Sequence, residues 1–206
     1  MKSKMAILAG LVACAVTGAC GTGNDTSSQE RGDLPKLSQA AVTDVTWYES
    51  WDEGMAAAEK AGKPVLVHFT ADWCVYCRKM KNETYTSPEI KKRFNEGWIT
   101  IMIDTDDKVK TGKVYVEDST KKALAWKNGN NDSFKAETMG HGQLLQFFGG
   151  MGLPTLLFID KNGAPLNKIS SFMPPKDLAV ILDFFQQEAY DTMTFDEFKK
   201  KAESRS

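Results

Sequence analysis

The chain has 206 residues, of which 42% are hydrophobic, so it can hold a short leader and one domain with a core of ordinary size. Its 26 Lys and Arg residues nearly balance 27 Asp and Glu residues, and the formal net charge is -1. Such a chain has no general attraction to nucleic acid or to anionic membranes. The composition therefore argues against two large domains and against a nucleic-acid partner.

The N-terminus has the features of an export signal. Two lysines precede an apolar stretch, residues 5–16, which is too short to span a bilayer permanently. The small residues before Cys20 resemble a bacterial lipoprotein processing site, where the cysteine becomes the lipidated first residue of the mature chain. Cys14 offers a second such site but leaves an unusually short leader, and a plain secretory leader is a third alternative. We expect a signal peptide over residues 1–19 and lipidation at Cys20.

A flexible tether follows the expected signal peptide. Residues 20–44 are rich in Gly, Ser, Thr, Asp and Gln and have little to bury. We therefore expect the folded domain to cover residues 45–206. Once the leader is removed and Cys20 is lipidated, Cys74 and Cys77 are the remaining free thiols of the four cysteines, which argues against a disulfide scaffold.

The first predicted elements of the domain lead to a pair of cysteines. Residues 50–61 have helical spacing, and residues 65–69 are typical of a short buried strand. Residues 73–77, Trp-Cys-Val-Tyr-Cys, stand where this strand ends and a helix can begin. Cys74 and Cys77 would then lie on one helix face, where a disulfide can form and the helix N-terminus favours a thiolate on Cys74. The pattern indicates redox chemistry or metal binding.

The remaining elements are predicted from apolar runs and from the turn and cap residues between them. A long polar segment, residues 107–148, contains a possible short strand at 114–116 and a polar turn at 128–132. It precedes Gly152-Leu153-Pro154-Thr155. The predicted helices are 87–95, 175–189 and one beginning at Thr194, and the predicted strands are 98–104, 156–159 and 166–170. This order predicts a mixed sheet with helices on both faces.

Two segments, Ala71 to Met80 around the cysteine pair and Gly152 to Thr155, carry a family resemblance. In this order they resemble the active-site segment and the cis-proline loop of the thioredoxin superfamily. Within this superfamily they resemble more closely the exported thioredoxin-like domains at the C-terminus of DsbD-type disulfide interchange reductases. The resemblance covers about residues 47–188. It implies an α/β, thioredoxin-like three-layer fold with a mixed central sheet, helices on both faces, and an insertion at about 107–148 before the cis-proline loop.

The resemblance also implies a function and a set of site residues. Cys74 would attack a target disulfide and Cys77 would resolve the mixed disulfide, with a cis Pro154 beside them. The supporting or substrate-binding residues would be Trp73, His68, Tyr76, Leu153, Pro154 and Thr155. We expect a thiol-disulfide oxidoreductase of the bacterial periplasm, tethered as a lipoprotein, that reduces protein disulfides and is recharged by a membrane or periplasmic thiol reductant. No cofactor and no metal is expected.

The chain departs from the family pattern at three places. His68 stands six residues before Cys74, where many relatives have a buried acid. It could relay a proton, stabilise a thiolate when charged, or pack as a neutral core residue. Lys81 occupies a position where the closest reductase domains can carry an acid. Residues 107–148 are much longer than a minimal crossing, and we predict that they form a cap or a partner-selecting edge near Cys74, with a decorative insertion as the alternative.

Other functions stay open on the sequence alone. The Val75-Tyr76 pair does not reveal the sign of its effect on the redox potential, so an oxidase or isomerase is possible on these residues. Copper or zinc handling would use Cys74 and Cys77, with His141 and methionines completing a softer copper site. A redox-inactive interaction module is a further alternative. His141, between two glycines, is otherwise predicted to be a surface loop residue.

Overall fold

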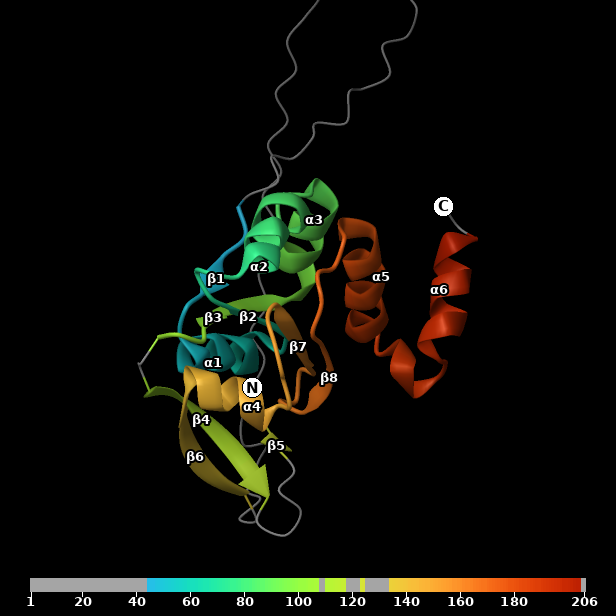
Figure 1. Cartoon of the computed structure of the whole chain (residues 1–206). Coiled ribbons are helices and arrows are strands. Elements are labelled where there is room, and N and C mark those ends of the chain that lie inside the picture. Colours follow the sequence, from blue (N-terminus) through green and yellow to red (C-terminus); the bar gives the residue numbers. More distant parts are fainter. Residues whose placement is uncertain (1–43, 108–109, 118–122, 125–133, 205–206) are drawn as a thin grey trace, which may run out of the picture. The chain divides into compact units, whose positions relative to one another are not determined.

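A five-stranded mixed sheet forms the centre of the fold (Figure 1). The computed structural model describes residues 44–107, 110–117, 123–124 and 134–204. The strand order is β1-β3-β2-β7-β8. The strands are β1 (Trp47–Tyr48), β2 (Val65–Thr70), β3 (Ile99–Asp104), β7 (Thr155–Ile159) and β8 (Pro165–Ile169). The first three run parallel, and β7 and β8 add antiparallel pairs on the other side of β2.

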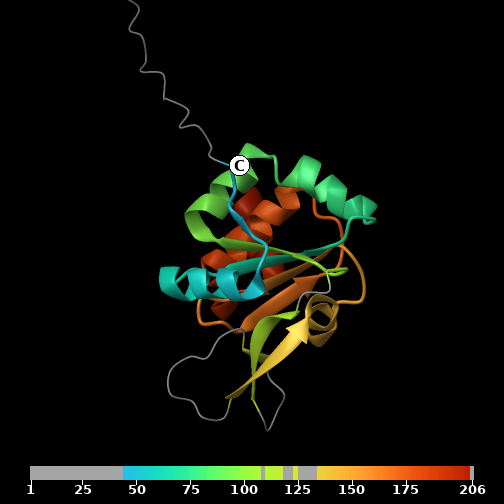
Figure 2. The same ribbon diagram turned by 90° about the vertical axis from the view of Figure 1, so that its left-hand side faces the viewer.

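Helices cover both faces of this sheet (Figure 2). On one face lie α1 (Trp51–Ala61) and α4 (His141–Phe147), and on the other lie α2 (Val75–Lys79), the π-helical η1 (Met80–Thr84), α3 (Pro88–Gly97) and α5 (Pro175–Gln186). The central strand β2 is buried at every residue, because its alternate side chains enter two different cores. Val67 packs in the core under α1 and α4, whereas Leu66 packs in the core under α3 and α5. The three-layer thioredoxin-like fold is therefore confirmed.

A second, three-stranded sheet is inserted between β3 and α4. It contains β4 (Lys110–Glu117), β5 (Ala123–Leu124) and β6 (Phe134–Gly140) in the order β5-β4-β6, all antiparallel. Val114 is buried in the core formed by α1 and α4, and the Lys113 backbone N–H donates to the Asp52 carboxylate over 2.9 Å. The predicted strand at 114–116 is confirmed within β4. The predicted polar turn at 128–132 lies outside the described residues.

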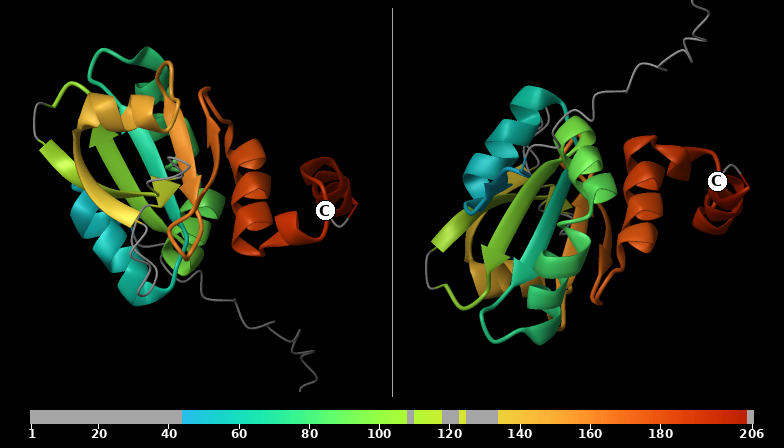
Figure 3. Two further views of the ribbon diagram at one scale, coloured as in Figure 1. Left: turned by 90° about the horizontal axis from the view of Figure 1, so that it is seen from below. Right: turned by 90° about the horizontal axis from the view of Figure 1, so that it is seen from above.

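The C-terminal part of the chain forms a helical layer outside the sheet. Helix α6 (Phe195–Glu203) lies on the outer side of α5 (Figure 3). Phe195 and Phe198 pack against Phe184 of α5, with ring centroids 5.4 Å away in each pair. Thr194 and Glu197 form the predicted capping box. The predicted helix at 175–189 ends earlier, because Glu188 takes a left-handed conformation with φ of 52° and a 3₁₀ turn (Ala189–Asp191) follows.

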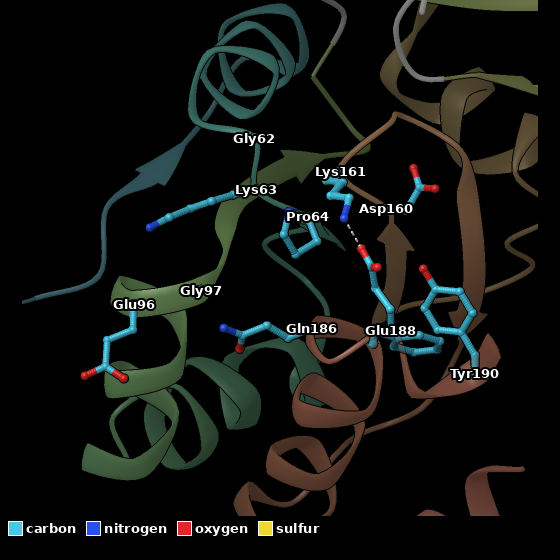
Figure 4. Close-up of a pocket in the computed structure, with 11 residues that line it drawn as sticks. Gly62, Lys63, Pro64, Glu96, Gly97, Asp160, Lys161, Gln186, Glu188 and Tyr190 are labelled. Carbon is cyan, nitrogen blue, oxygen red and sulfur yellow. Dashed lines mark ion pairs between the residues drawn. The ribbon is translucent and has the colours of Figure 1, made fainter. Parts of the chain in front are cut away.

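A polar pocket of ≈ 240 Å³ marks the end of the sheet where β2 begins (Figure 4). Lys161 forms an ion pair with Glu188 there. Lys63 Nζ donates to the Asn95 carbonyl in the last turn of α3, over 3.3 Å, so its positive charge lies at a helix C-terminus. The charged groups at this end therefore stabilise one another and the ends of the helices.

Candidate functional site

The two cysteines form a disulfide at the beginning of α2. Cys74 is the N-cap residue of that helix, and its Sγ accepts a hydrogen bond from the Cys77 backbone N–H over 3.1 Å. Their Cα atoms lie 5.2 Å apart. Cys74 is 4% exposed and Cys77 is 0% exposed, so the first cysteine lies nearer to solvent. This order suits attack by Cys74 and resolution by Cys77.

The local sequence explains why a helix begins at this point. Strand β2 ends at Thr70, and the Cys74 N–H donates to the Ala71 carbonyl in the turn that follows. Helix α2 then continues without interruption into η1, up to Thr84. The first turn of α2 has no acidic residue, whereas Arg78 and Lys79 stand in its last turn. The positive end of the helix dipole and the Cys77 N–H therefore face the sulfur of Cys74, and the same helix turn has no carboxylate beside them.

The loop before β7 brings the predicted proline to the site. The peptide bond between Leu153 and Pro154 is cis, as the resemblance implies, and Pro154 is buried. The Thr155 hydroxyl bonds to the Gly152 carbonyl and to the Ser170 hydroxyl, over 2.7 Å in each case. Thr155 is 1% exposed, so its side chain holds the loop together from inside. Leu153, in contrast, is half-buried and lines a groove at the surface.

That groove has a volume of ≈ 480 Å³ and runs between Trp73 and the cis-proline loop. Trp73 forms one wall, and its indole N–H donates to the Asp106 carboxylate over 2.7 Å. Helix α4 and the loop after it form the other walls. The lining residues are Trp73, Thr105, Gly142, Leu145, Gln146, Gly150, Met151, Gly152 and Leu153.

Exposed apolar side chains gather around the disulfide. Among residues whose exposure is described, the large hydrophobic side chains that stay exposed are Trp73, Val75, Tyr76 and Met151. Three of them flank Cys74 and Cys77 in the sequence, and the fourth precedes the cis-proline loop. Since large exposed apolar groups that cluster mark interaction sites, this end of the domain has the surface of a protein-binding site.

His68 lies fully buried on β2, on the face covered by η1, α3 and α5. Neither ring nitrogen has a hydrogen-bond partner among the described residues. The rings of Trp47 and Tyr85 surround it, with centroids 6.5 and 5.4 Å away. Burial, and secondarily the charge of Lys81, lowers the pKa of His68 to about 3. His68 is therefore neutral at physiological pH, which fits the packing alternative and not the charged one; a proton relay near neutral pH would require a far higher pKa.

The structure corrects the expectation for His141. It is not a surface loop residue: it is buried, begins α4, and its Nδ1 lies 2.8 Å from the Asp104 carbonyl oxygen. The flanking glycines indicate an exposed turn, but Gly140 is the N-cap of α4 and Gly142 lies in the first turn of that helix. His141 thus fastens the start of α4 to Asp104 at the end of β3. Two residues later, Asp106 accepts the hydrogen bond from the Trp73 indole.

Sequence reasoning missed three other residues that shape this end of the domain. Asp106 orients Trp73, Leu145 forms the floor of the groove, and Tyr85 contacts His68. Burial raises the pKa of Tyr85 well above its ordinary value. Of these, Asp106 had a local signal, because it follows a predicted strand that ends beside the predicted active-site strand.

The segment predicted to form a cap or partner-selecting edge, residues 107–148, contains two parts: the three-stranded sheet and helix α4. The described strands β4 and β6 lie against α1 and α4 (Figure 1). Helix α4, through Gly142, Leu145 and Gln146, is the part that lines the groove.

The predicted leader and anchor lie outside the described residues. The signal peptide, Cys14, Cys20 and most of the tether fall within residues 1–43, outside the described residues. Within the described ranges, no helix has the length and apolar character needed to cross a membrane. In the same ranges, His, Cys, Asp and Glu side chains do not gather in groups of three or more that could hold a metal ion.

Comparison with known proteins places the chain in a family. A family model described as "Thioredoxin-like domain" matches residues 51–186. The chain belongs to the thioredoxin-like family. The matched segment contains the Cys74–Cys77 disulfide and the cis Pro154 loop.

Individual relatives share parts of this thioredoxin-like chain. DsbD, a "Thiol:disulfide interchange protein" of Yersinia enterocolitica, is 23% identical over 149 residues, which are 71% of this chain and 20% of DsbD. Spermatogenesis-associated protein 20 of Mus musculus is 32% identical over 82 residues, 40% of this chain and 10% of that protein. The chain thus spans between 10% and 20% of the length of these curated relatives.

Solved structures support the same fold. A thioredoxin-fold protein from Helicobacter pylori has a TM-score of 0.55 at 19% identity, covering 80% of this chain and 91% of its own. A structure titled "DsbH Oxidoreductase" has a TM-score of 0.50 at 18% identity, covering 76% of this chain and 94% of its own. At these identities the likeness concerns the fold.

Proposed function

We propose that this thioredoxin-like domain is a thiol-disulfide oxidoreductase that acts on disulfides of other proteins. The observation that carries the proposal is the disulfide between the N-cap Cys74 and the buried Cys77, together with the cis bond before Pro154 and a groove that Trp73 and Leu153 both line. The helix N-terminus favours a thiolate on Cys74 once the disulfide is reduced. The groove provides a surface for a polypeptide beside the reactive sulfur.

The exchange proceeds in two displacements. In the reduced protein the Cys74 thiolate attacks one sulfur of a partner disulfide, forms a mixed disulfide, and expels the other partner sulfur as a thiolate. Cys77, after losing its proton to solvent, attacks the Cys74 sulfur and releases the second partner thiolate. The partner gains two electrons and, from solvent, two protons, and Cys74 and Cys77 return to the disulfide. A thiol reductant then returns two electrons to the pair.

We favour the reducing direction in the cell envelope. A vicinal cysteine pair in an oxidising compartment rests as a disulfide unless a partner keeps reducing it, so a membrane or periplasmic thiol reductant completes the cycle. The leader-like N-terminus supports export to the bacterial periplasm, and Cys20 supports a lipid anchor. The similarity to the thiol:disulfide interchange protein DsbD supports exchange chemistry.

Trapping tests the exchange chemistry directly. In cells, Cys77→Ala in the full chain removes the resolving thiol, and we expect partner proteins to accumulate as mixed disulfides on Cys74 that disappear on reduction. The matched control is Cys74→Ala, which keeps one buried thiol and should trap little. Equal amounts of adduct on the two variants would contradict the proposed roles.

Two further measurements test the direction and the location. The redox state of the Cys74–Cys77 pair in cells should be mostly reduced while the reductant is present, whereas a mostly oxidised pair together with a high reduction potential would favour an oxidase. Cys20→Ala should release the protein from the membrane fraction, and Cys14→Ala should not. Unchanged fractionation of Cys20→Ala would contradict lipidation at that residue.

No observation on the described residues favours the copper alternative over exchange. His141 is held by the Asp104 carbonyl at 2.8 Å, at the start of α4. Thiol-disulfide exchange therefore remains the function that the geometry supports best.

A further inference from the structure

Met151 is an anomaly within the groove. Its side chain is 98% exposed, the highest exposure among the large hydrophobic residues described. It stands three residues before Pro154 and lines the groove with Trp73 and Leu145. An unbranched apolar side chain in water gains about 25 cal/mol for each Å² that a partner covers, and this residue has nearly its whole surface available.

The loop geometry accounts for this exposure. Gly149 has φ of 73°, and the Gly150 N–H donates to the Leu145 carbonyl over 2.9 Å. A Cβ on Gly150 would lie 2.1 Å from Leu145 Cδ1, so only glycine lets the loop lie this close to α4. The backbone is thus pressed against α4, and the next residue projects outward. The loop positions Met151 at the surface without burying it in the fold.

The charges around the groove restrict what it can accept. No Lys or Arg is among its lining residues, and the Asp106 carboxylate is bound to the Trp73 indole at its edge. Asp104 ends β3 two residues before Asp106, and Asp107 follows Asp106 directly. An acidic side chain entering this groove would lose water and meet the Asp106 carboxylate at its edge, and no lining Lys or Arg would compensate for the lost water. An uncharged apolar side chain meets neither penalty.

We infer that Met151 is a specificity-determining residue, which selects partner segments that carry an apolar side chain beside the reactive cysteine. The occupant is an extended segment of the partner protein, because one wall of the groove is Trp73, the residue directly before Cys74 of the proposed exchange site. The flexible thioether of methionine adapts to different aliphatic and aromatic side chains and makes favourable contacts with rings. The selection is therefore for apolar character rather than for one residue type. This inference rests on the proposed exchange function.

Single-turnover kinetics with matched peptides test the inference. Pre-reduced protein is mixed with three peptides that carry one cysteine in disulfide linkage to a chromogenic thiol and differ at the preceding residue, which is Phe, Ser or Glu. For the wild type we expect the order Phe, then Ser, then Glu. Met151→Ala should slow the Phe peptide about fivefold to tenfold and leave the Ser peptide within about twofold. Met151→Leu should restore most of the rate, and Met151→Lys should slow the Phe peptide and accelerate the Glu peptide.

Controls separate this inference from the exchange function. Lys168→Ala removes an exposed side chain next to Gly149 but outside the groove lining, and it should leave all three rates unchanged. The reduction potential should be the same in every variant, and Lys168→Ala should also keep the wild-type rate with a small disulfide, cystamine. If the Met151 variants reduce all peptides as the wild type does, the inference is overturned while exchange stands. If the wild type reduces neither cystamine nor any peptide, the proposed function itself fails.

Discussion

The two ends of the central sheet use their side chains in opposite ways. Where β2 begins, Lys63, Lys161 and Glu188 engage one another or the ends of α3 and α5 (Figure 4). Where β2 ends, Trp73 and Met151 expose apolar surface, and the buried His68 has no hydrogen-bond partner among the described residues. Interactions that are satisfied within the domain contribute to stability, whereas apolar surface left exposed is available to a partner. The difference supports the proposed exchange function at the disulfide end.

The largest expected effect is on activity at the disulfide end. Cys74→Ser should lower the rate of protein-disulfide reduction at least about 10³-fold, because it removes the attacking thiolate. Lys161→Ala, at the opposite end, should leave the rate unchanged. Turnover of a protein disulfide by the pre-reduced proteins measures both. A comparable loss in Lys161→Ala would show that the two ends are coupled.

The buried His68 predicts an acid-sensitive stability. Its pKa is about 3 in the folded state and about 6.5 when exposed, so the unfolded state binds more protons between these values. The stability due to neutral His68 is complete above pH 6.5 and is lost as pH falls toward 3, by about 1.4 kcal/mol per pH unit. His68→Leu should remove this part of the slope.

Chemical denaturation of the oxidised protein at pH 7, 5.5 and 4.5 measures the effect of His68. Other groups also titrate in this range, so the difference between His68→Leu and the wild type is the quantity to compare. The stability of His68→Leu relative to the wild type should rise as the pH falls, because unfolding exposes an imidazole that takes up a proton only in the wild type. Parallel curves would mean that His68 is not neutral and buried as described.

Two glycines give a matched comparison of packing. Gly150→Ala should cost about 1–3 kcal/mol, because the new Cβ would meet Leu145 Cδ1 at 2.1 Å and the Leu145 carbonyl oxygen at 3.2 Å. Gly97→Ala should cost only a few tenths of a kcal/mol, because the atoms in its way belong to the exposed, flexible Gln186 side chain. Thermal unfolding compares both with the wild type. Equal losses would contradict the tight contact between the cis-proline loop and α4.

The smallest effect is expected for the ion pair at the far end. Glu188→Gln removes the charge that faces Lys161 on the surface. Exposed ion pairs contribute little because water and salt screen them, so the unfolding midpoint should shift little and the exchange rate not at all. A large shift would show that Glu188, with its φ of 52°, depends on this pair to keep its conformation.

Local patterns were sufficient for most elements of this fold. The apolar run of β2, the cysteine pair after it and the proline before β7 appear in the sequence as short segments with direct local signals. Less local features were missed. Residue 141 was assigned to the surface because glycines flank it, and its burial depends on the Asp104 carbonyl, 37 residues earlier in the chain.

The candidate site shows the same division between features with a local sequence signal and features that depend on distant segments. The cysteine pair and the cis proline follow from short motifs, whereas the groove depends on elements that no short motif joins. Trp73, Asp106, Leu145 and Met151 come from four separate segments. Their meeting requires the parallel pairing of β2 with β3 and the docking of α4 against the following loop.

The sequence by itself determined the dithiol, its place at a helix start and the layers of the fold, because each follows from the spacing of neighbouring residues. The tertiary structure decided the protonation of His68 and the exposure of Met151. His68 is neutral because it is completely buried among aromatic rings. Met151 is exposed because Gly150 lets the loop before it lie against α4. Both depend on the surroundings that distant segments provide, and pKa values and solvent exposure are properties of those surroundings.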